Sequence, residues 1–405
     1  MSMPRAVKHI NEVRVIDALY RQGTSTRADL ARDLGLMRST VGNLIAGLVE
    51  QGIVLEREVS GSTPGGRAGR PGQHVQLNPG HSAIFGADIG IGHLSVVAVD
   101  LGGRLIESKT VEFEGVQSDV EQTVRKLADM VRRAVKRLPA GQTPRGLCVA
   151  APGLIDRDRQ VLMRAPMLNW HDLPVGRLVR DALKWDDEVT LENDANAFAA
   201  AEVYGRRWGS VDDALFVYVD AGVGGGLVSQ GKLQRGHNGY AGEIGHIHLG
   251  EQGFDPKTAL EGSFESYVGR SAVLARYRHH GGKASSLADV VAALEAGQAA
   301  ARHVAEEWAW WFGRGMASLI SVLNPGRVVL GGAVAQICRH VEAEVIASIR
   351  KHSVTPYPLP PLEMSTLGDD ACAIGAAMTL HRSMLDFDKR LVFGGGAALA
   401  EGAEA

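Results

Sequence analysis

The segment from Gly242 to Tyr267, "GEIGHIHLGEQGFDPKTALEGSFESY", holds residue types suited to binding hydroxyl groups. Glu243 and His246 lie three residues apart, and Glu265 follows after a loop. Because one carboxylate can accept hydrogen bonds from two neighbouring hydroxyls, this set suits a polyhydroxy ligand. A polar site of this kind also discriminates strongly against ligands that lack a hydroxyl. The alternative is a surface loop with an incidental histidine.

A second polar pair stands in "LENDAN", where an apolar stretch at 189–191 precedes the start of a helix. A carboxylate at Asp194 would be held rigidly there and stabilised by the exposed N–H groups of the helix N-terminus. Asn193 and Asp194 are also residues that commonly cap helices. The pair therefore predicts a helix cap, a ligand contact, or both together.

The elements that must position these side chains follow one plan used twice. "AIFGADIGIGHLSVVAVDLGGRLIES" predicts three strands joined by tight glycine turns, and "ALFVYVDAGVGGGLVSQGKLQRG" repeats that plan roughly 130 residues later. Two such units with helices predict two α/β lobes, with a ligand in the cleft between them. We expect a first lobe at 81–200 joined by a C-terminal helix at 370–390, a second lobe at 201–369, and a flexible tail at 393–405.

Residues 1–80 predict a separate DNA-binding domain. Ala31, Gly35 and Val41 have the spacing of a helix-turn-helix, in which a small residue, a turn glycine and a buried aliphatic residue seat one helix on another. The second helix would present four polar residues to the major groove: Arg38, Ser39, Thr40 and Asn43.

Two alternating segments then predict a wing. "IVLEREV" and "QHVQLN" read as paired strands, and the tip between them carries Arg67 and Arg70, which suit phosphates or a minor groove. The alternative for this region is a plain helical bundle followed by a linker. Three helices, a hairpin and a basic tip in this order favour a winged helix.

Composition is consistent with this division. The charge balance is +3 over residues 1–80 and −6 over the rest, as expected for a nucleic-acid reader attached to an acidic body. Cys148, Cys338 and Cys372 are few and scattered, which predicts reduced structural thiols. Neither a secretory signal nor a run of ~18 apolar residues is present, so we expect a cytoplasmic protein with no membrane segment.

Taken together, the duplicated Asp–Gly turns, "LENDAN", "GEIGH" and the glutamate nineteen residues after its histidine resemble the ROK family of repressors, open reading frames and sugar kinases. The N-terminal winged helix resembles the regulator branch, which includes xylose and N-acetylglucosamine repressors. The resemblance implies a two-lobed actin-like/hexokinase-like ATPase fold, a duplicated ribonuclease H-like architecture. It also implies homodimers or homotetramers that bind operator DNA under the control of a sugar or sugar-phosphate effector.

The resemblance assigns sugar-binding roles by position. In family kinases the residue matching Asp194 is the general base. The positions expected to contact the sugar are Asn193, Asp194, Glu243, His246, Glu265 and, in the turn "VAAPGLI", Gly153.

Many family members also bind zinc through the motif histidine and three cysteines that lie ten, twelve and seventeen residues later. Here those positions hold Pro256, Thr258 and Ser263, which are poor or impossible zinc ligands. We therefore expect no metal and no cofactor. Packing of three aromatic residues would then have to hold Glu265 in place: Phe254, Phe264 and Tyr267.

The turns that bind phosphates in family kinases are also altered. Ile91, Gly92 and His93 stand in place of Gly-Gly-Thr, and Asp220 with Ala221 stands in place of Gly-Thr. The hydroxyls are lost, and Asp220 would repel the phosphates of ATP. The sequence thus predicts a sugar-responsive DNA-binding regulator that is not an enzyme. The alternatives are an active sugar kinase with an added DNA-binding domain, or a regulator controlled by a protein partner.

Overall fold

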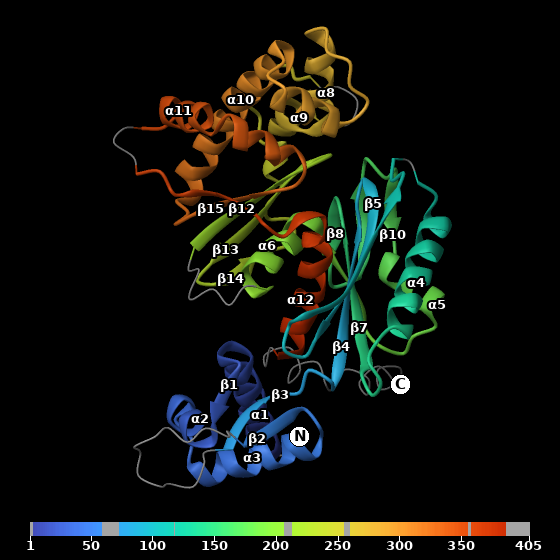
Figure 1. Cartoon of the computed structure of the whole chain (residues 1–405), viewed down its shortest axis with the longest axis vertical. Helices are drawn as coiled ribbons and strands as arrows, with labels where there is room; N and C mark the ends of the chain where they lie inside the picture. Colours follow the sequence, from blue (N-terminus) through green and yellow to red (C-terminus); the bar gives the residue numbers. More distant parts are fainter. Residues whose placement is uncertain are drawn as a thin grey trace, which may run out of the picture.

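The computed structural model describes residues 3–58, 73–116, 118–205, 213–254, 260–354 and 358–385. An N-terminal domain lies at one end of the molecule and two α/β lobes lie beyond it, with helices α6 and α12 between the lobes (Figure 1). Among these residues, no helix combines the length and the apolar character needed to cross a bilayer.

The N-terminal domain packs three helices against a three-stranded antiparallel sheet of order β1-β3-β2. Its elements are α1 (Met3–Gln22), β1 (Thr24–Thr26), α2 (Arg27–Leu34), α3 (Arg38–Glu50), β2 (Val54–Glu58) and β3 (Gln73–Leu77). Helix α2 ends at Leu34, and the backbone of the next residue, Gly35, takes the left-handed conformation with φ of 64°. Ala31 and Val41 are buried where α2 meets α3, so the predicted helix-turn-helix contact is confirmed.

The segment "TST" has two roles. Thr26 caps α2 by accepting a hydrogen bond from the Asp29 N–H. Residues 24–26 also pair with β3, which extends the wing to three strands. The wing tip at 59–72, with Arg67 and Arg70, lies outside the described residues.

The first lobe contains a five-stranded sheet of order β11-β7-β4-β5-β6. Strands β11, β7 and β4 are parallel, and β5 and β6 are antiparallel additions. A small antiparallel sheet, β10-β9-β8, is inserted before α5 and was not predicted. The elements are β4 (Ser82–Ile89), β5 (Gly92–Asp100), β6 (Leu105–Phe113), α4 (Val120–Lys136), β7 (Thr143–Ala151), β8 (Leu154–Asp156), β9 (Val161–Ala165), β10 (Trp170–Leu173), α5 (Val175–Leu183) and β11 (Val189–Asn193).

The second lobe repeats this topology. Its sheet has the order β14-β13-β12-β15-β16, with β12, β15 and β16 parallel and β13 and β14 antiparallel. The strands are β12 (Asp213–Val219), β13 (Val223–Ser229), β14 (Lys232–Gln234), β15 (Val328–Gly331) and β16 (Leu362–Met364). Its helices are α7 (Phe264–Val268), α8 (Arg270–His279), α9 (Leu287–Glu295), α10 (Ala299–Leu323) and α11 (Glu342–His352). Short 3-10 turns at 244–246, 334–340 and 368–370 precede α7, α11 and α12. The predicted duplication is therefore present strand for strand.

Helices α6 (Asp194–Gly205) and α12 (Ala371–Leu385) fill the space between the two sheets. Their buried residues share one apolar core with Ile84 of the first sheet and Phe216 of the second. The two helices cross closely at Gly375, where an added Cβ would stand 1.6 Å from the Ala197 carbonyl oxygen. All three cysteines are buried and unpaired, and burial raises the pKa of Cys148 to about 12, as expected of structural thiols.

Candidate ligand-binding cleft

A cavity of about 500 Å³ opens between the two lobes at the ends of their central strands. It is lined by both glycine turns, by the inserted small sheet and by the 242–246 loop. Cavities of this size accommodate small-molecule ligands. Five of the six residues predicted to bind a sugar line it together: Gly153, Asp194, Glu243, His246 and Glu265.

The sixth residue, Asn193, supports the cavity wall and does not line it. Its Oδ1 accepts a hydrogen bond of 3.1 Å from the Asn196 N–H and so caps α6. Its Nδ2 donates to the Gly153 carbonyl oxygen at 3.1 Å. These bonds let Asn193 position Gly153 and the start of α6, and its direct contact with a sugar stays a prediction.

Asp194 is the first residue of α6, and it faces the cavity from the helix N-terminus. Burial and the nearby charges of Asp88, Glu243 and Asp220 together raise the pKa of Asp194 to about 7, although the hydrogen bond from the Ala195 N–H opposes the rise. Asp194 therefore exchanges its proton near neutral pH. A carboxyl group in this condition can act as either donor or acceptor toward a hydroxyl.

The loop carrying Glu243 and His246 lies directly on strand β13. Gly225 donates a backbone hydrogen bond of 2.8 Å to the Gly242 carbonyl oxygen, and a Cβ on Gly242 would stand 1.9 Å from the Gly225 carbonyl oxygen. Only glycine fits this contact, which explains the residue before Glu243. Burial raises the pKa of Glu243, and the His246 imidazole, 3.8 Å away, opposes the rise.

Glu265 lies on α7 and reaches the second glycine turn. Its Oε2 accepts a hydrogen bond of 2.8 Å from the Val223 N–H. Ser263, at a position where family members have a zinc-binding cysteine, caps α7 by accepting from the Ser266 N–H. The absence of zinc from this loop stays a prediction, and Pro256 and Thr258 lie outside the described residues.

Aromatic packing holds α7, as the sequence predicted. Phe264 is fully buried against Phe312 with ring centroids 5.9 Å apart. Tyr267 stacks on Trp311 with centroids 3.8 Å apart, and Phe254 meets the edge of Tyr267. Because these contacts flank Glu265 on its own helix, they restrict where its carboxylate can lie.

The altered first turn brings a carboxylate and an imidazole into the cavity. His93 Nε2 lies 2.8 Å from Asp88 Oδ2. Although burial acts in the opposite direction, the hydrogen bond and charge of Asp88 raise the pKa of His93. The other carboxylate oxygen, Asp88 Oδ1, is buried with no hydrogen-bond partner. Both residues are among those that line the cavity.

In the altered second turn, at Asp220 and Ala221, the carboxylate forms an ion pair with an arginine. Arg270, at the start of α8, pairs with the Asp220 carboxylate and donates a 3.3 Å hydrogen bond to the Ile91 carbonyl oxygen in the first lobe. Burial raises the pKa of Asp220, and the Arg270 charge opposes that rise. The Asp220–Arg270 pair therefore bridges the two lobes. Neither Arg270 nor the cavity-lining Arg164 was singled out from the sequence, because neither stands in a recognisable motif.

The helix-turn-helix presents the predicted residues as expected of a DNA-binding surface. Arg38, Ser39 and Asn43 are exposed on the first turns of α3, and Thr40 is half-buried. Their contact with DNA stays a prediction.

The N-terminal domain also contacts the α6/α12 pair directly. The Tyr20 hydroxyl donates a 2.6 Å hydrogen bond to the Tyr204 carbonyl oxygen near the end of α6. The ring centroids of Tyr20 and His381, a residue of α12, lie 4.9 Å apart. Arg382 of α12 forms an ion pair with Asp17. Helix α6 thus begins at the cavity and ends at the N-terminal domain.

Fold and site together define a two-lobed ligand-binding body joined to a winged helix. The chain belongs to the ROK family, which it matches over residues 84–383, and residues 13–58 match the IclR helix-turn-helix domain. The predicted family and fold class are therefore confirmed.

Relatives of two kinds resemble the chain. It is 27% identical over 398 residues to the xylose repressor of Caldicellulosiruptor bescii, across 94% of this chain and 98% of that protein. It is 29% identical over 265 residues to a glucokinase of Halalkalibacterium halodurans, across 60% of this chain and 78% of that protein. The repressor thus matches nearly the whole chain, and the glucokinase matches a smaller part.

Solved structures that resemble the chain also include both a regulator and a glucokinase. A ROK family transcriptional regulator described as a homolog of the E. coli MLC protein superposes with a TM-score of 0.77 at 22% identity, covering 94% of this chain and 98% of that one. A ROK family glucokinase from Streptomyces griseus, in complex with glucose and AMPPNP, gives 0.64 at 25% identity and covers 75% of this chain and 100% of that one.

Proposed function

We propose that this chain is a transcriptional repressor whose affinity for operator DNA is set by a neutral sugar bound in the cleft. The main support for this proposal is the position of helix α6. The helix begins at Asp194 in the cavity and reaches Tyr204, whose carbonyl oxygen accepts a hydrogen bond from the Tyr20 hydroxyl of the winged helix. At 1.5 Å per residue, this twelve-residue helix spans about 18 Å.

The charge of the cavity favours a neutral ligand over a phosphorylated one. Five carboxyl groups line it, while Arg164 and two histidines are the basic groups among the lining residues. A phosphate would have to enter this field against repulsion. Hydroxyl groups would instead meet several carboxylate acceptors in the lining.

Kinase activity is not part of the proposal. Asp220 and Arg270 form their ion pair at the turn that corresponds to a phosphate-binding turn of family kinases. A phosphate chain entering there would have to separate this largely buried pair, which would leave one charge uncompensated. The glucokinase relatives match a smaller share of this chain than the xylose repressor does, so they do not favour kinase activity over regulation.

Regulation requires a difference in sugar affinity between two arrangements of the molecule. A sugar that contacts Asp194 and Glu243 at once would favour one separation of the lobes. Because α6 and α12 are closely packed and contact Tyr20 and Asp17, a shift of this helix pair would move the winged helix. In a homodimer on a palindromic operator, this would change the spacing of the two recognition helices α3.

The test is the variant Glu243→Gln, studied beside Glu261→Gln, an exposed glutamate outside the cavity. Losing a charged hydrogen bond of about 1.5–3 kcal/mol should weaken sugar binding by roughly 10- to 150-fold. Operator affinity without sugar should stay near that of the wild type in both variants. Calorimetry measures sugar binding, and fluorescence anisotropy measures DNA binding. A Glu243→Gln protein that responds to sugar as the wild type does would show that the effector binds elsewhere.

A further inference from the structure

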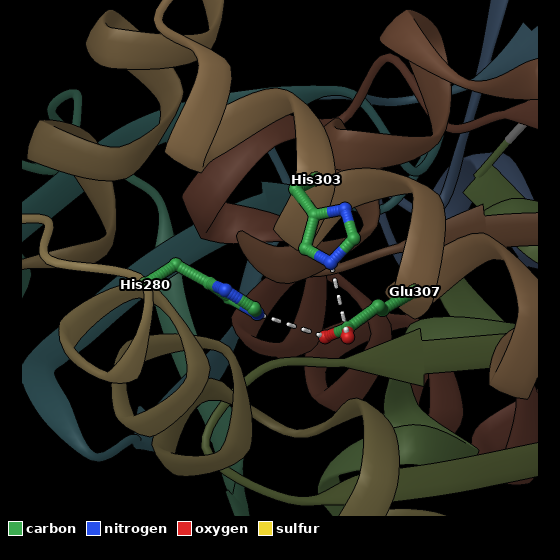
Figure 2. Close-up of side chains that lie close together, drawn as sticks. All are labelled: His280, His303 and Glu307. Atoms are coloured by element: carbon green, nitrogen blue, oxygen red, sulfur yellow. Dashed lines mark ion pairs between the residues drawn. The ribbon is translucent and has the colours of Figure 1, made fainter.

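A cluster of metal-binding residue types lies away from the cleft, where the end of α8 meets α10. His280 follows α8, and His303 and Glu307 lie one turn apart on α10 (Figure 2). The two imidazole rings, with centroids 4.5 Å apart, both point toward the Glu307 carboxylate. One ligand atom from each residue lies within 4.8 Å of the other two.

Two of the distances in this cluster are close to those that a metal ion imposes, and the three ligand atoms all lie within 4.8 Å of one another. His280 Nε2 lies 3.5 Å from Glu307 Oε2, and His303 Nε2 lies 3.5 Å from Glu307 Oε1. Ligands about 2.0–2.1 Å from a tetrahedral ion lie about 3.3–3.4 Å from one another. The carboxylate and either imidazole therefore need only a few tenths of an ångström of adjustment.

The backbone fixes the cluster from both sides. After α8, Gly281 N–H donates to Arg278 O and Gly282 N–H donates to Tyr277 O, which closes the helix end around His280. On α10, the four-residue spacing of His303 and Glu307 puts both on one face of a continuous helix. Two rigid elements thus bring the three side chains together, so little ordering would be needed on binding.

The three ligand atoms favour one class of metal ion. Two imidazole nitrogens and one carboxylate suit zinc and similar divalent transition ions, whereas magnesium and calcium prefer oxygen ligands alone. Glu307 Oε2 is shielded from solvent and has no hydrogen-bond partner, so it is an available acceptor. The buried guanidinium of Arg276 attracts the same carboxylate, and we therefore expect weaker binding than in closed four-ligand zinc sites.

We propose that His280, His303 and Glu307 bind one zinc ion, or a similar divalent transition ion, that joins α8 to α10. This site is separate from the 246–263 loop in which the family's zinc ligands are replaced. Helix α8 starts at Arg270, which pairs with Asp220 and reaches Ile91 across the cleft. The ion would therefore stabilise the helix that carries the bridge between the lobes.

The experiment titrates zinc into the full-length chain by calorimetry, after chelator treatment and removal of any polyhistidine tag, since a tag binds the same ions. His303→Ala is the main variant because its side chain is 55% exposed and its loss should not disturb folding. Glu307→Gln tests the carboxylate. His279→Ala is the matched control, because this exposed neighbour of His280 lies outside the cluster.

The expected result is saturable binding of one zinc ion per chain, with a higher melting temperature in the presence of zinc. His303→Ala and Glu307→Gln should each weaken that binding at least about tenfold, and His279→Ala should leave it unchanged. Absence of saturable binding to the wild type would overturn the proposal. Wild-type affinity in both cluster variants would do the same, because it would place the ion elsewhere. Neither outcome depends on the sugar response.

Discussion

Asp194 should reduce the stability of the folded chain, and replacing it with asparagine should reveal by how much. Burial and the charges of Asp88, Glu243 and Asp220 raise its pKa to about 7. In the unfolded chain the pKa returns to about 3.9. Between these values the folded chain keeps a proton that the unfolded chain has lost. The free energy of unfolding therefore falls as pH rises through this window and levels off above pH 7.

The size of this effect follows from the shift. Three pKa units at about 1.36 kcal/mol each give an upper limit of about 4 kcal/mol. Because the carboxyl group lines an open cavity, we expect a smaller value, about 1–3 kcal/mol. Asparagine does not ionise, and its amide oxygen can still accept from the Ala195 N–H. Asp194→Asn should therefore be more stable than the wild type at pH 8, with a smaller difference at pH 5.

Urea unfolding of both proteins at pH 5 and pH 8 measures this difference. The same substitution at Asp158, an exposed residue outside the cavity, controls for the general effect of removing a carboxylate. A variant less stable than the wild type at pH 8, or an effect independent of pH, would show that ionised Asp194 does not destabilise the folded chain. The variant should also bind sugar more weakly, which would identify Asp194 as a residue retained for binding at a cost in stability.

Two further substitutions test the DNA side. Arg38→Ala should weaken operator binding by about 1–3 kcal/mol if Arg38 reads a base edge, as measured by anisotropy at fixed salt; unchanged affinity would remove it from the interface. Tyr20→Phe removes only the hydroxyl that donates to Tyr204, so the factor by which sugar changes DNA affinity should shrink by up to roughly fivefold while sugar affinity itself stays the same. A full sugar response in Tyr20→Phe would show that the coupling follows another path.

The fold could be predicted because its signals are local and repeated. Both three-stranded units carry the alternation and glycine turns of a meander, so their strands were found from the sequence. Gly35 and Val41 likewise predicted the helix-turn-helix from spacing alone. The small sheet β8–β10 was missed because strands of three to five residues leave almost no periodic signal.

The site could be predicted only in part. Glu243 and Asp194 stand in motifs, and the cavity brings them together. Asn193 stands in the same motif, and no spacing reveals that its amide also bonds Gly153 and caps α6; its contact with a sugar stays a prediction. Arg270 lies fifty residues after Asp220 in the chain, and only the tertiary fold brings the two side chains together. No sequence pattern therefore indicates that Arg270 compensates the charge of Asp220.

The central claim is that the cleft and the winged helix are thermodynamically coupled. The most direct test titrates the wild-type protein onto labelled DNA from upstream of its own gene, with and without each of a panel of neutral sugars, and then measures affinity for the active sugar with and without that DNA. We expect that one sugar weakens DNA binding and that DNA weakens sugar binding by the same factor, about 5- to 150-fold. Tight DNA binding that no sugar changes would show that the cleft and the winged helix are not coupled.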